Sequence, residues 1–205
     1  MKKFLTVVVL FAALMTAVPA KAEVKFGLKG GLNLTNMRFD SSVADKSNQA
    51  GFFIGPTVKF TIPIVGLGFD ASALYDQRKG KVNDLDVKQQ SIQIPINIRY
   101  GFGLGSTASI YFFAGPQFGF NVGDKSFTSF DKATATASTW TLKSSNLSAN
   151  VGLGLMLLGH LQVSANYNFA LGKTGEYEYI QSASSMMYKG DTKMNAWQIG
   201  LTYFF

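Results

Sequence analysis

The chain has 205 residues, of which 47% are hydrophobic, 14% aromatic and 15% charged, and its formal net charge is +7. This composition excludes disordered and collagen-like chains, and the lack of cysteine excludes disulfides, zinc–thiolate sites and iron–sulfur clusters. His160 is the single histidine, so mechanisms that need two imidazoles are excluded as well. We expect no catalytic residues, no cofactor and no metal site. The Lys and Arg residues form no cluster with aromatic residues, so we expect no nucleic-acid partner.

The first segment has the pattern of a secretory signal peptide. Two lysines follow Met1, an uncharged apolar stretch runs over residues 4–17, and Ala20 and Ala22 supply the small residues of an Ala-x-Ala cleavage site. The apolar stretch is too short to cross a bilayer comfortably as a helix, although an N-terminal anchor is the alternative. We predict a signal peptide over residues 1–22, cleaved after Ala22, and one mature domain over residues 23–205.

Apolar residues recur at every second position of the mature chain, which is the period of β-strands. Eight such blocks lie at residues 24–34, 52–62, 67–75, 92–102, 108–122, 147–157, 161–171 and 197–205. The opposite parity carries mainly Asn, Gln, Ser, Thr and Gly, with few of the Lys and Glu residues that cover soluble surfaces. This pattern predicts strands with an apolar face and a confined polar face.

The connections between these blocks alternate strictly between short and long. The short ones lie at about residues 63–66, 103–105 and 158–160, and the long ones at about 37–50, 78–89, 123–146 and 172–194. Such alternation is typical of outer-membrane barrels and has no reason to occur in a soluble sandwich. We therefore predict an all-β fold, an eight-stranded antiparallel up-and-down transmembrane β-barrel whose short turns face the periplasm. The competing hypothesis of transmembrane helices over residues 100–123 and 144–172 would scatter their polar residues over every face.

Proline residues are the main conflict with this prediction, since each removes one hydrogen bond from a strand ladder. Pro56, Pro95 and Pro116 fall inside predicted strands, and two of them follow a glycine. We expect local bulges at Gly55-Pro56 and Gly115-Pro116 that shift the strand parity by one.

The last predicted strand ends the chain with alternating aromatic and aliphatic residues. It carries Trp197, Ile199, Leu201, Tyr203 and the terminal Phe205 on one parity. We interpret this pattern as the C-terminal signal read by the outer-membrane assembly machinery, which would be a partner during biogenesis.

A small set of charges falls on the polar parity near the short turns. The turn at residues 63–66 places Lys59 opposite Asp70, and we expect a salt bridge between them. Lys25 and Arg99 complete this lumen ionic cluster, and Asp76 lies higher. A hydrated structural network is the simpler interpretation, because buried charges need partners; an anion site or a small gated conduit is the alternative.

Two further polar features lie in connections. The segment from Arg78 to Lys81 reads as a solvated loop, and His160 reads as a polar residue of a short turn. Alternation over residues 127–142 and 176–180 predicts strands that extend above the membrane.

Several segments resemble a known family. Residues 51–56 and 111–116 share Phe-Phe-x-Gly-Pro, and they accompany the Ile-Pro-Ile-Asn-Ile-Arg-Tyr segment at 94–100 and the Phe-terminated last strand. Together these segments resemble the PorT-like outer-membrane β-barrel family of Gram-negative bacteria, over essentially the whole mature chain. The resemblance implies a barrel in the outer membrane and leaves the activity open, although some members are linked to a secretion apparatus.

We therefore expect a non-enzymatic integral protein of the cell outer membrane, with membrane lipid as its surroundings. Its role would be structural or surface recognition through the long extracellular loops, toward an unknown ligand. The alternatives are an anion-preferring channel for small solutes, an accessory component of a secretion system, and a lipid-modifying enzyme.

Overall fold

The computed structural model describes residues 23–39, 49–62, 66–82, 85–104, 107–123, 126–131, 136–181 and 186–205. The predicted signal peptide, with Ala20 and Ala22, lies outside the described residues. Among the described residues, no helix is long and apolar enough to cross a membrane. The strands, all in one sheet, are β1 (Glu23–Phe39), β2 (Gln49–Ile62), β3 (Leu67–Ser72), β4 (Leu74–Val82), β5 (Leu85–Gly103), β6 (Ala108–Asn121), β7 (Ser126–Asp131), β8 (Thr136–Leu142), β9 (Ser145–Leu157), β10 (Leu161–Ala170), β11 (Gly175–Gln181) and β12 (Met186–Phe204).

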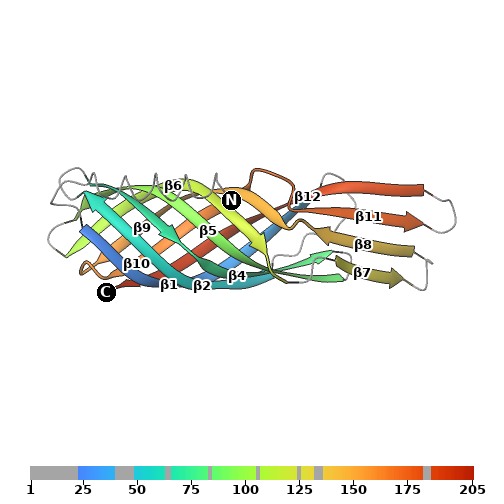
Figure 1. The fold of residues 1–205 in the computed structure, drawn as a ribbon, viewed down its shortest axis with the longest axis horizontal. Coiled ribbons are helices and arrows are strands. Elements are labelled where there is room, and N and C mark those ends of the chain that lie inside the picture. Colours follow the sequence, from blue (N-terminus) through green and yellow to red (C-terminus); the bar gives the residue numbers. More distant parts are fainter. Residues whose placement is uncertain are drawn as a thin grey trace, which may run out of the picture.

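The sheet closes on itself as an antiparallel barrel, which confirms the predicted fold class (Figure 1). Within the described chain β3 and β4 form one barrel strand, so the barrel order is β1, β2, β3/β4, β5, β6, β9, β10 and β12, and β12 pairs back with β1. One circuit of directly paired residues runs through Val24, Phe60, Phe69, Ile98, Ala114, Val151, Tyr167, Trp197 and Leu34. The circuit returns to β1 ten residues (34 − 24) above its start. For eight strands this stagger gives a tilt of roughly 40° to the barrel axis.

Strands continue beyond the barrel at the end that carries the long connections. β11 pairs with both β12 and β8, and β8 pairs with β7, so these strands form a sheet that projects from the barrel (Figure 1). Strands over residues 127–142 and 176–180 were predicted, and β7, β8 and β11 confirm them. β4 and β5 likewise pair as far as Val82 and Leu85, inside the predicted connection at 78–89.

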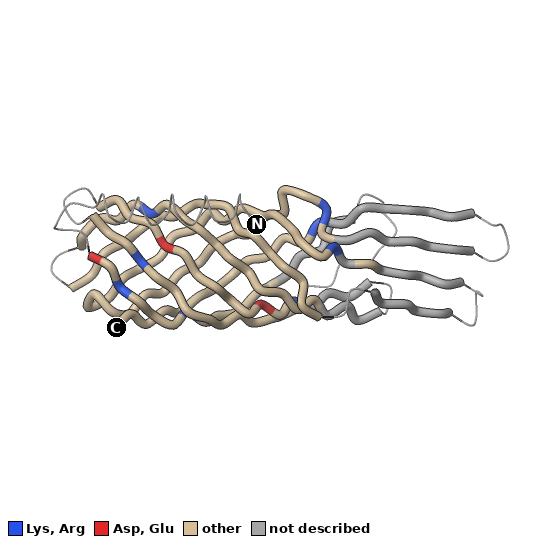
Figure 2. The backbone as a smooth tube through the Cα atoms, in the orientation of Figure 1, with Lys and Arg blue, Asp and Glu red and all other residues tan. Residues whose placement is uncertain are grey.

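The outer surface of the barrel is apolar. Phe26, Leu32, Ile98, Val151 and Leu201 are each more than half exposed. All of them occupy the alternate positions that the sequence analysis predicted to be apolar. Figure 2 shows that the barrel carries few charged residues along its length. A surface of this kind suits hydrocarbon rather than water.

Outward-facing aromatic rings contact one another near both ends of the barrel. Near the short turns, the Tyr100 and Phe102 ring centroids lie 4.6 Å apart. Toward the long connections, the Tyr167 and Trp197 centroids lie 5.0 Å apart. Aromatic side chains at two levels match the girdles that mark both interfaces of a membrane barrel.

The prediction of bulges at the two Gly-Pro steps is wrong. Pro56 faces Leu28 in one unbroken register along β1 and β2, and Pro116 faces Ala149 in an unbroken register along β6 and β9. A Cβ atom on Gly55 would collide with the carbonyl oxygen of Ala73 on the neighbouring strand. Glycine before proline therefore lets the two backbones approach closely, and the missing proline N–H leaves a local gap in pairing without inserting a residue.

Candidate functional site in the barrel lumen

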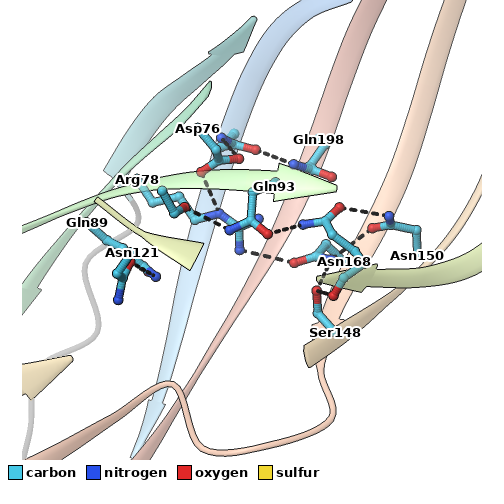
Figure 3. Close-up of polar contacts among 12 residues, drawn as sticks. Asp76, Arg78, Gln89, Gln93, Asn121, Ser148, Asn150, Asn168 and Gln198 are labelled. Atoms are coloured by element: carbon cyan, nitrogen blue, oxygen red, sulfur yellow. Dashed lines mark hydrogen bonds and ion pairs between the residues drawn. The ribbon is translucent and has the colours of Figure 1, made fainter. Parts of the chain in front are cut away.

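A polar layer, here called the amide layer, crosses the lumen toward the long-connection end (Figure 3). Its members are buried side chains from seven of the eight barrel strands. They are Asn33 on β1, Asp76 and Arg78 on β4, Gln93 on β5, Gln117 on β6, Asn150 on β9, Asn166 and Asn168 on β10, and Gln198 on β12.

One half of the amide layer is organised by an ion pair. Gln198 Nε2 donates to Asn33 Oδ1 at 2.6 Å, and Asn33 Nδ2 donates to Asp76 Oδ2 at 3.0 Å. Arg78 Nε donates to Asp76 Oδ1 at 3.0 Å, and Arg78 Nη1 donates to Asn168 Oδ1 at 3.0 Å. Both charges are thus paired and hydrogen-bonded, which is the condition for burying them.

The other half of the amide layer closes a ring. Asn168 Nδ2 donates to Asn150 Oδ1 at 2.8 Å, and Asn166 Nδ2 lies 3.4 Å from the same oxygen and 2.8 Å from Gln198 Oε1. A branch extends from Asn150 Nδ2 to Gln117 Oε1 at 2.8 Å. The ring of hydrogen bonds ties strands on opposite sides of the lumen together.

The interpretation of the segment from Arg78 to Lys81 as a solvated loop is wrong for Arg78. The residue is 4% exposed, on β4, and its side chain bonds to Asp76 inside the lumen. Arg78 follows Asp76 by two residues, so the strand alternation that placed Asp76 inside could have placed Arg78 there as well. The basic residues that follow it in sequence obscured this signal.

A second layer of charges, here called the cationic layer, lies nearer the short turns. It consists of Lys29, Lys59, Asp70 and Arg99, all buried. The register places Lys59 directly opposite Asp70, as the turn predicts. The ion pair of Asp70, however, is with Arg99, at 3.7 Å between Arg99 Nη1 and Asp70 Oδ2. Asp70 Oδ1 also accepts a hydrogen bond from Asn97 Nδ2 at 2.8 Å, so two neighbours on β5 engage the carboxylate in place of Lys59.

Aromatic rings face all three cations of this layer. The Arg99 guanidinium carbon lies 4.0 Å from the Tyr111 ring centroid, and the Lys59 and Lys29 Nζ atoms lie 4.6 Å from Phe204 and 6.0 Å from Phe113. Arg99 Nη1 also donates to Gln162 Oε1 at 3.0 Å. Lys29 was not predicted as a member of the cluster, although it shares the inward parity of Lys25.

Lys25 lies at the rim rather than in the cationic layer. Its Nζ pairs with Glu23 at 2.9 Å and donates to the carbonyl oxygen of Gly159 at 3.0 Å, in the turn between β9 and β10. His160 lies in the same turn, exposed, with Nδ1 2.8 Å from the carbonyl oxygen of Leu158. The expectation that His160 is a turn residue is confirmed.

The predicted C-terminal signal lies on the outer face of β12. Trp197, Ile199, Leu201 and Tyr203 are each about half exposed, and Phe205 is 73% exposed. Phe204 is instead buried, beneath the Lys59 ammonium. The predicted signal residues therefore lie on the outer face of the barrel, and Phe204, of the opposite parity, packs inside the lumen.

A closed barrel with an apolar exterior and a hydrogen-bonded polar interior defines an integral membrane β-barrel. The family model described as outer membrane protein beta-barrel domain matches residues 5–205. The chain belongs to this family and is a protein of the outer membrane, where its apolar surface meets lipid. The family match leaves the PorT-like subfamily an open prediction.

Solved structures of other outer membrane proteins are similar to this chain. The outer membrane protein OprG from Pseudomonas aeruginosa is 17% identical, with a TM-score of 0.51, over 88% of this chain and 95% of OprG. Neisserial surface protein A is 16% identical, with a TM-score of 0.49, over 89% of this chain and 99% of that one. Ail, the attachment invasion locus protein of Yersinia pestis, is 15% identical, with a TM-score of 0.45, over 89% and 99%. No curated protein sequence matches the chain.

Proposed function

We propose that the protein is a non-enzymatic outer membrane protein that does not conduct solutes and that presents strands beyond the barrel for surface recognition. The ring of hydrogen bonds in the amide layer is the observation that carries this proposal. An eight-stranded barrel is just wide enough for side chains to fill, and here Arg78 on β4 bonds across it to Asn168 on β10. Solutes would have to break buried, satisfied hydrogen bonds to pass.

The projecting sheet supports the recognition part of the proposal. β7, β8, β11 and the first part of β12 are paired strands outside the barrel. Among the described strands, β7 pairs with β8 alone. An edge strand offers unpaired backbone N–H and C=O groups, to which an extended segment of a ligand can add as a further strand.

Conductance of the refolded protein tests the closed lumen. In planar bilayers we expect no steady current steps. Steady, reproducible steps would overturn the proposal and favour an anion-preferring channel. That second candidate draws support from the three cations and single carboxylate of the cationic layer.

Replacement of β7 and β8 tests the role of the projecting sheet. A variant with residues 126–142 replaced by a short Gly-Ser linker keeps every barrel strand, so it should fold. We expect the native protein to bind members of a peptide and glycan array that this variant does not bind. Identical binding by both proteins would remove the sheet from the proposal.

Three sequence predictions complete the proposal. We infer that residues 1–22 are a signal peptide cleaved after Ala22, and that Trp197, Ile199, Leu201, Tyr203 and Phe205 form the signal read by the assembly machinery. Within the family we infer a PorT-like member, on the two Phe-Phe-x-Gly-Pro segments.

A further inference from the structure

Two ammonium groups of the cationic layer are buried without an anionic partner. Lys29 is 8% exposed and Lys59 is 5% exposed. Within the part of the chain that the structure describes, neither makes an ion pair or a hydrogen bond, and each faces an aromatic ring instead. Cation–π contacts replace only part of the hydration that an ammonium loses on burial.

The carboxylates of the lumen attract these two charges but compensate them only in part. Asp70 is engaged by Arg99 and Asn97, and Asp76 is engaged by Arg78 and Asn33 in the amide layer. The cationic layer therefore holds an excess of positive charge inside a membrane-spanning barrel. A buried excess of this kind is expensive unless a counter-ion occupies the same space or a lysine gives up its proton.

A hydroxyl group beside Lys29 also lacks a partner. Thr202 Oγ1 is buried and makes no hydrogen bond among the described residues. Thr202 is the direct cross-strand neighbour of Lys29 on β12, which places the two Cβ atoms about 5 Å apart. Hydroxyl hydrogens rotate freely and, like ammonium groups, donate to anions.

The surrounding packing limits the size of any ligand. Space that a side chain at Gly154 would need is taken by Tyr111, and space at Gly152 is taken by Phe113. Space at Gly27 is likewise taken by Phe204. Aromatic rings thus fill the lumen around the cationic layer, so an organic molecule would be too large to bind there.

We propose that the cationic layer is a binding site for a small inorganic anion of the size of chloride. Lys29 and the Thr202 hydroxyl donate to the anion, and Lys59 adds positive charge. This inference goes beyond the proposed function, because a resident anion requires no conduction through the amide layer.

Thermal unfolding of the refolded protein tests the site. The protein is compared in chloride and in gluconate at equal ionic strength, since gluconate is too large to enter. We expect chloride at tenfold its dissociation constant to raise the unfolding midpoint by about 3–6 °C. Lys29→Met should abolish this shift, and Lys143→Met, at an exposed lysine outside the barrel strands, should retain it. An equal shift in all three proteins, or no shift in the native protein, would overturn the site.

The sign of the Lys29→Met effect gives an independent check. Without a bound anion, Lys29→Met removes an unpaired buried charge and should stabilise the protein equally in both salts. With a bound anion, it should stabilise the protein in gluconate, where the site is empty, and should stabilise it less or destabilise it in chloride.

Thr202→Val, which keeps the shape of the side chain, tests the site if Lys29→Met fails to fold, and should reduce the chloride shift. Crystals grown in bromide give a direct measurement. An anomalous peak beside Lys29 and Thr202 is expected, and its absence would refute the proposal.

Discussion

Single residues inside this barrel show two ways of placing a charge in a membrane protein. In the amide layer, Asp76 and Arg78 neutralise each other, and Asn33 and Asn168 bond to the pair, although Arg78 Nη2 makes no hydrogen bond among the described residues. In the cationic layer, Asp70 pairs with Arg99, and two lysines face only aromatic rings. The charges of the first arrangement balance within the protein, whereas the second keeps an excess of positive charge, which the proposed anion would balance.

The Asp76–Arg78 pair should therefore be costly to break from one side. Asp76→Asn keeps the size of the side chain but leaves the Arg78 guanidinium buried without a counter-charge, and we expect a loss of about 3–5 kcal/mol. Urea unfolding of the protein in lipid vesicles measures the change. The double variant Asp76→Asn/Arg78→Met should recover part of the loss, since it removes the orphaned charge. A double variant less stable than Asp76→Asn would contradict this account of the pair.

At this scale the sequence predicted which side chains face inward better than it predicted their partners. Alternation placed Lys59, Asp70 and Arg99 inside because parity is a property of each strand alone. It could not choose Arg99 over Lys59 as the partner of Asp70, since that choice depends on how far each side chain reaches across the lumen. The contact of Arg78 with Asn168, 90 residues away, depends on barrel closure in the same way.

At the scale of strands, the periodic blocks located the barrel strands but not their upper ends. β1 continues to Phe39 and β5 begins at Leu85, well beyond the apolar blocks at 24–34 and 92–102. Beyond the membrane a strand no longer needs an apolar outer face, so the period of two fades while backbone pairing continues. The prediction of bulges at the prolines was wrong because many flanking residue pairs fix the strand register, and one missing hydrogen bond does not shift it.

Inward-facing glycines set how closely neighbouring strands and lumen side chains can approach. A Cβ atom at Gly152 would collide with the Phe113 ring and with Asn166, whereas one at Gly101 would make only ordinary contacts, the nearest at 3.6 Å. Gly152→Ala should therefore cost about 1–3 kcal/mol through overpacking. Gly101→Ala, on the inward face of β5, is the matched control and should change stability by less than about 0.5 kcal/mol. Urea unfolding in lipid vesicles compares the two, and equal losses would mean that lumen packing does not set the cost.

For the molecule as a whole, closure between the first and last strands is the decisive feature. β1 and β12 are far apart in sequence, yet they pair from Gly27 with Phe204 up to Phe39 with Thr192. Closure leaves no open edge within the membrane, where an unpaired backbone group would cost several kcal/mol. The sequence predicted this feature through its even number of blocks, because strand alternation and short turns bring both termini of the barrel to the same side.

The lack of cysteine makes that seam directly testable. Leu32 and Ile199 are cross-strand partners on the outer face of β1 and β12, so Leu32→Cys/Ile199→Cys should form a disulfide in an otherwise cysteine-free chain. Boiling unfolds the barrel and should change the gel mobility of the native protein. The oxidised double variant stays circular after boiling and should differ in mobility from its reduced form. Leu32→Cys/Leu155→Cys, which pairs β1 with the non-adjacent β9, should show no such difference. A crosslink in the second variant but not in the first would mean that the strands close in a different order.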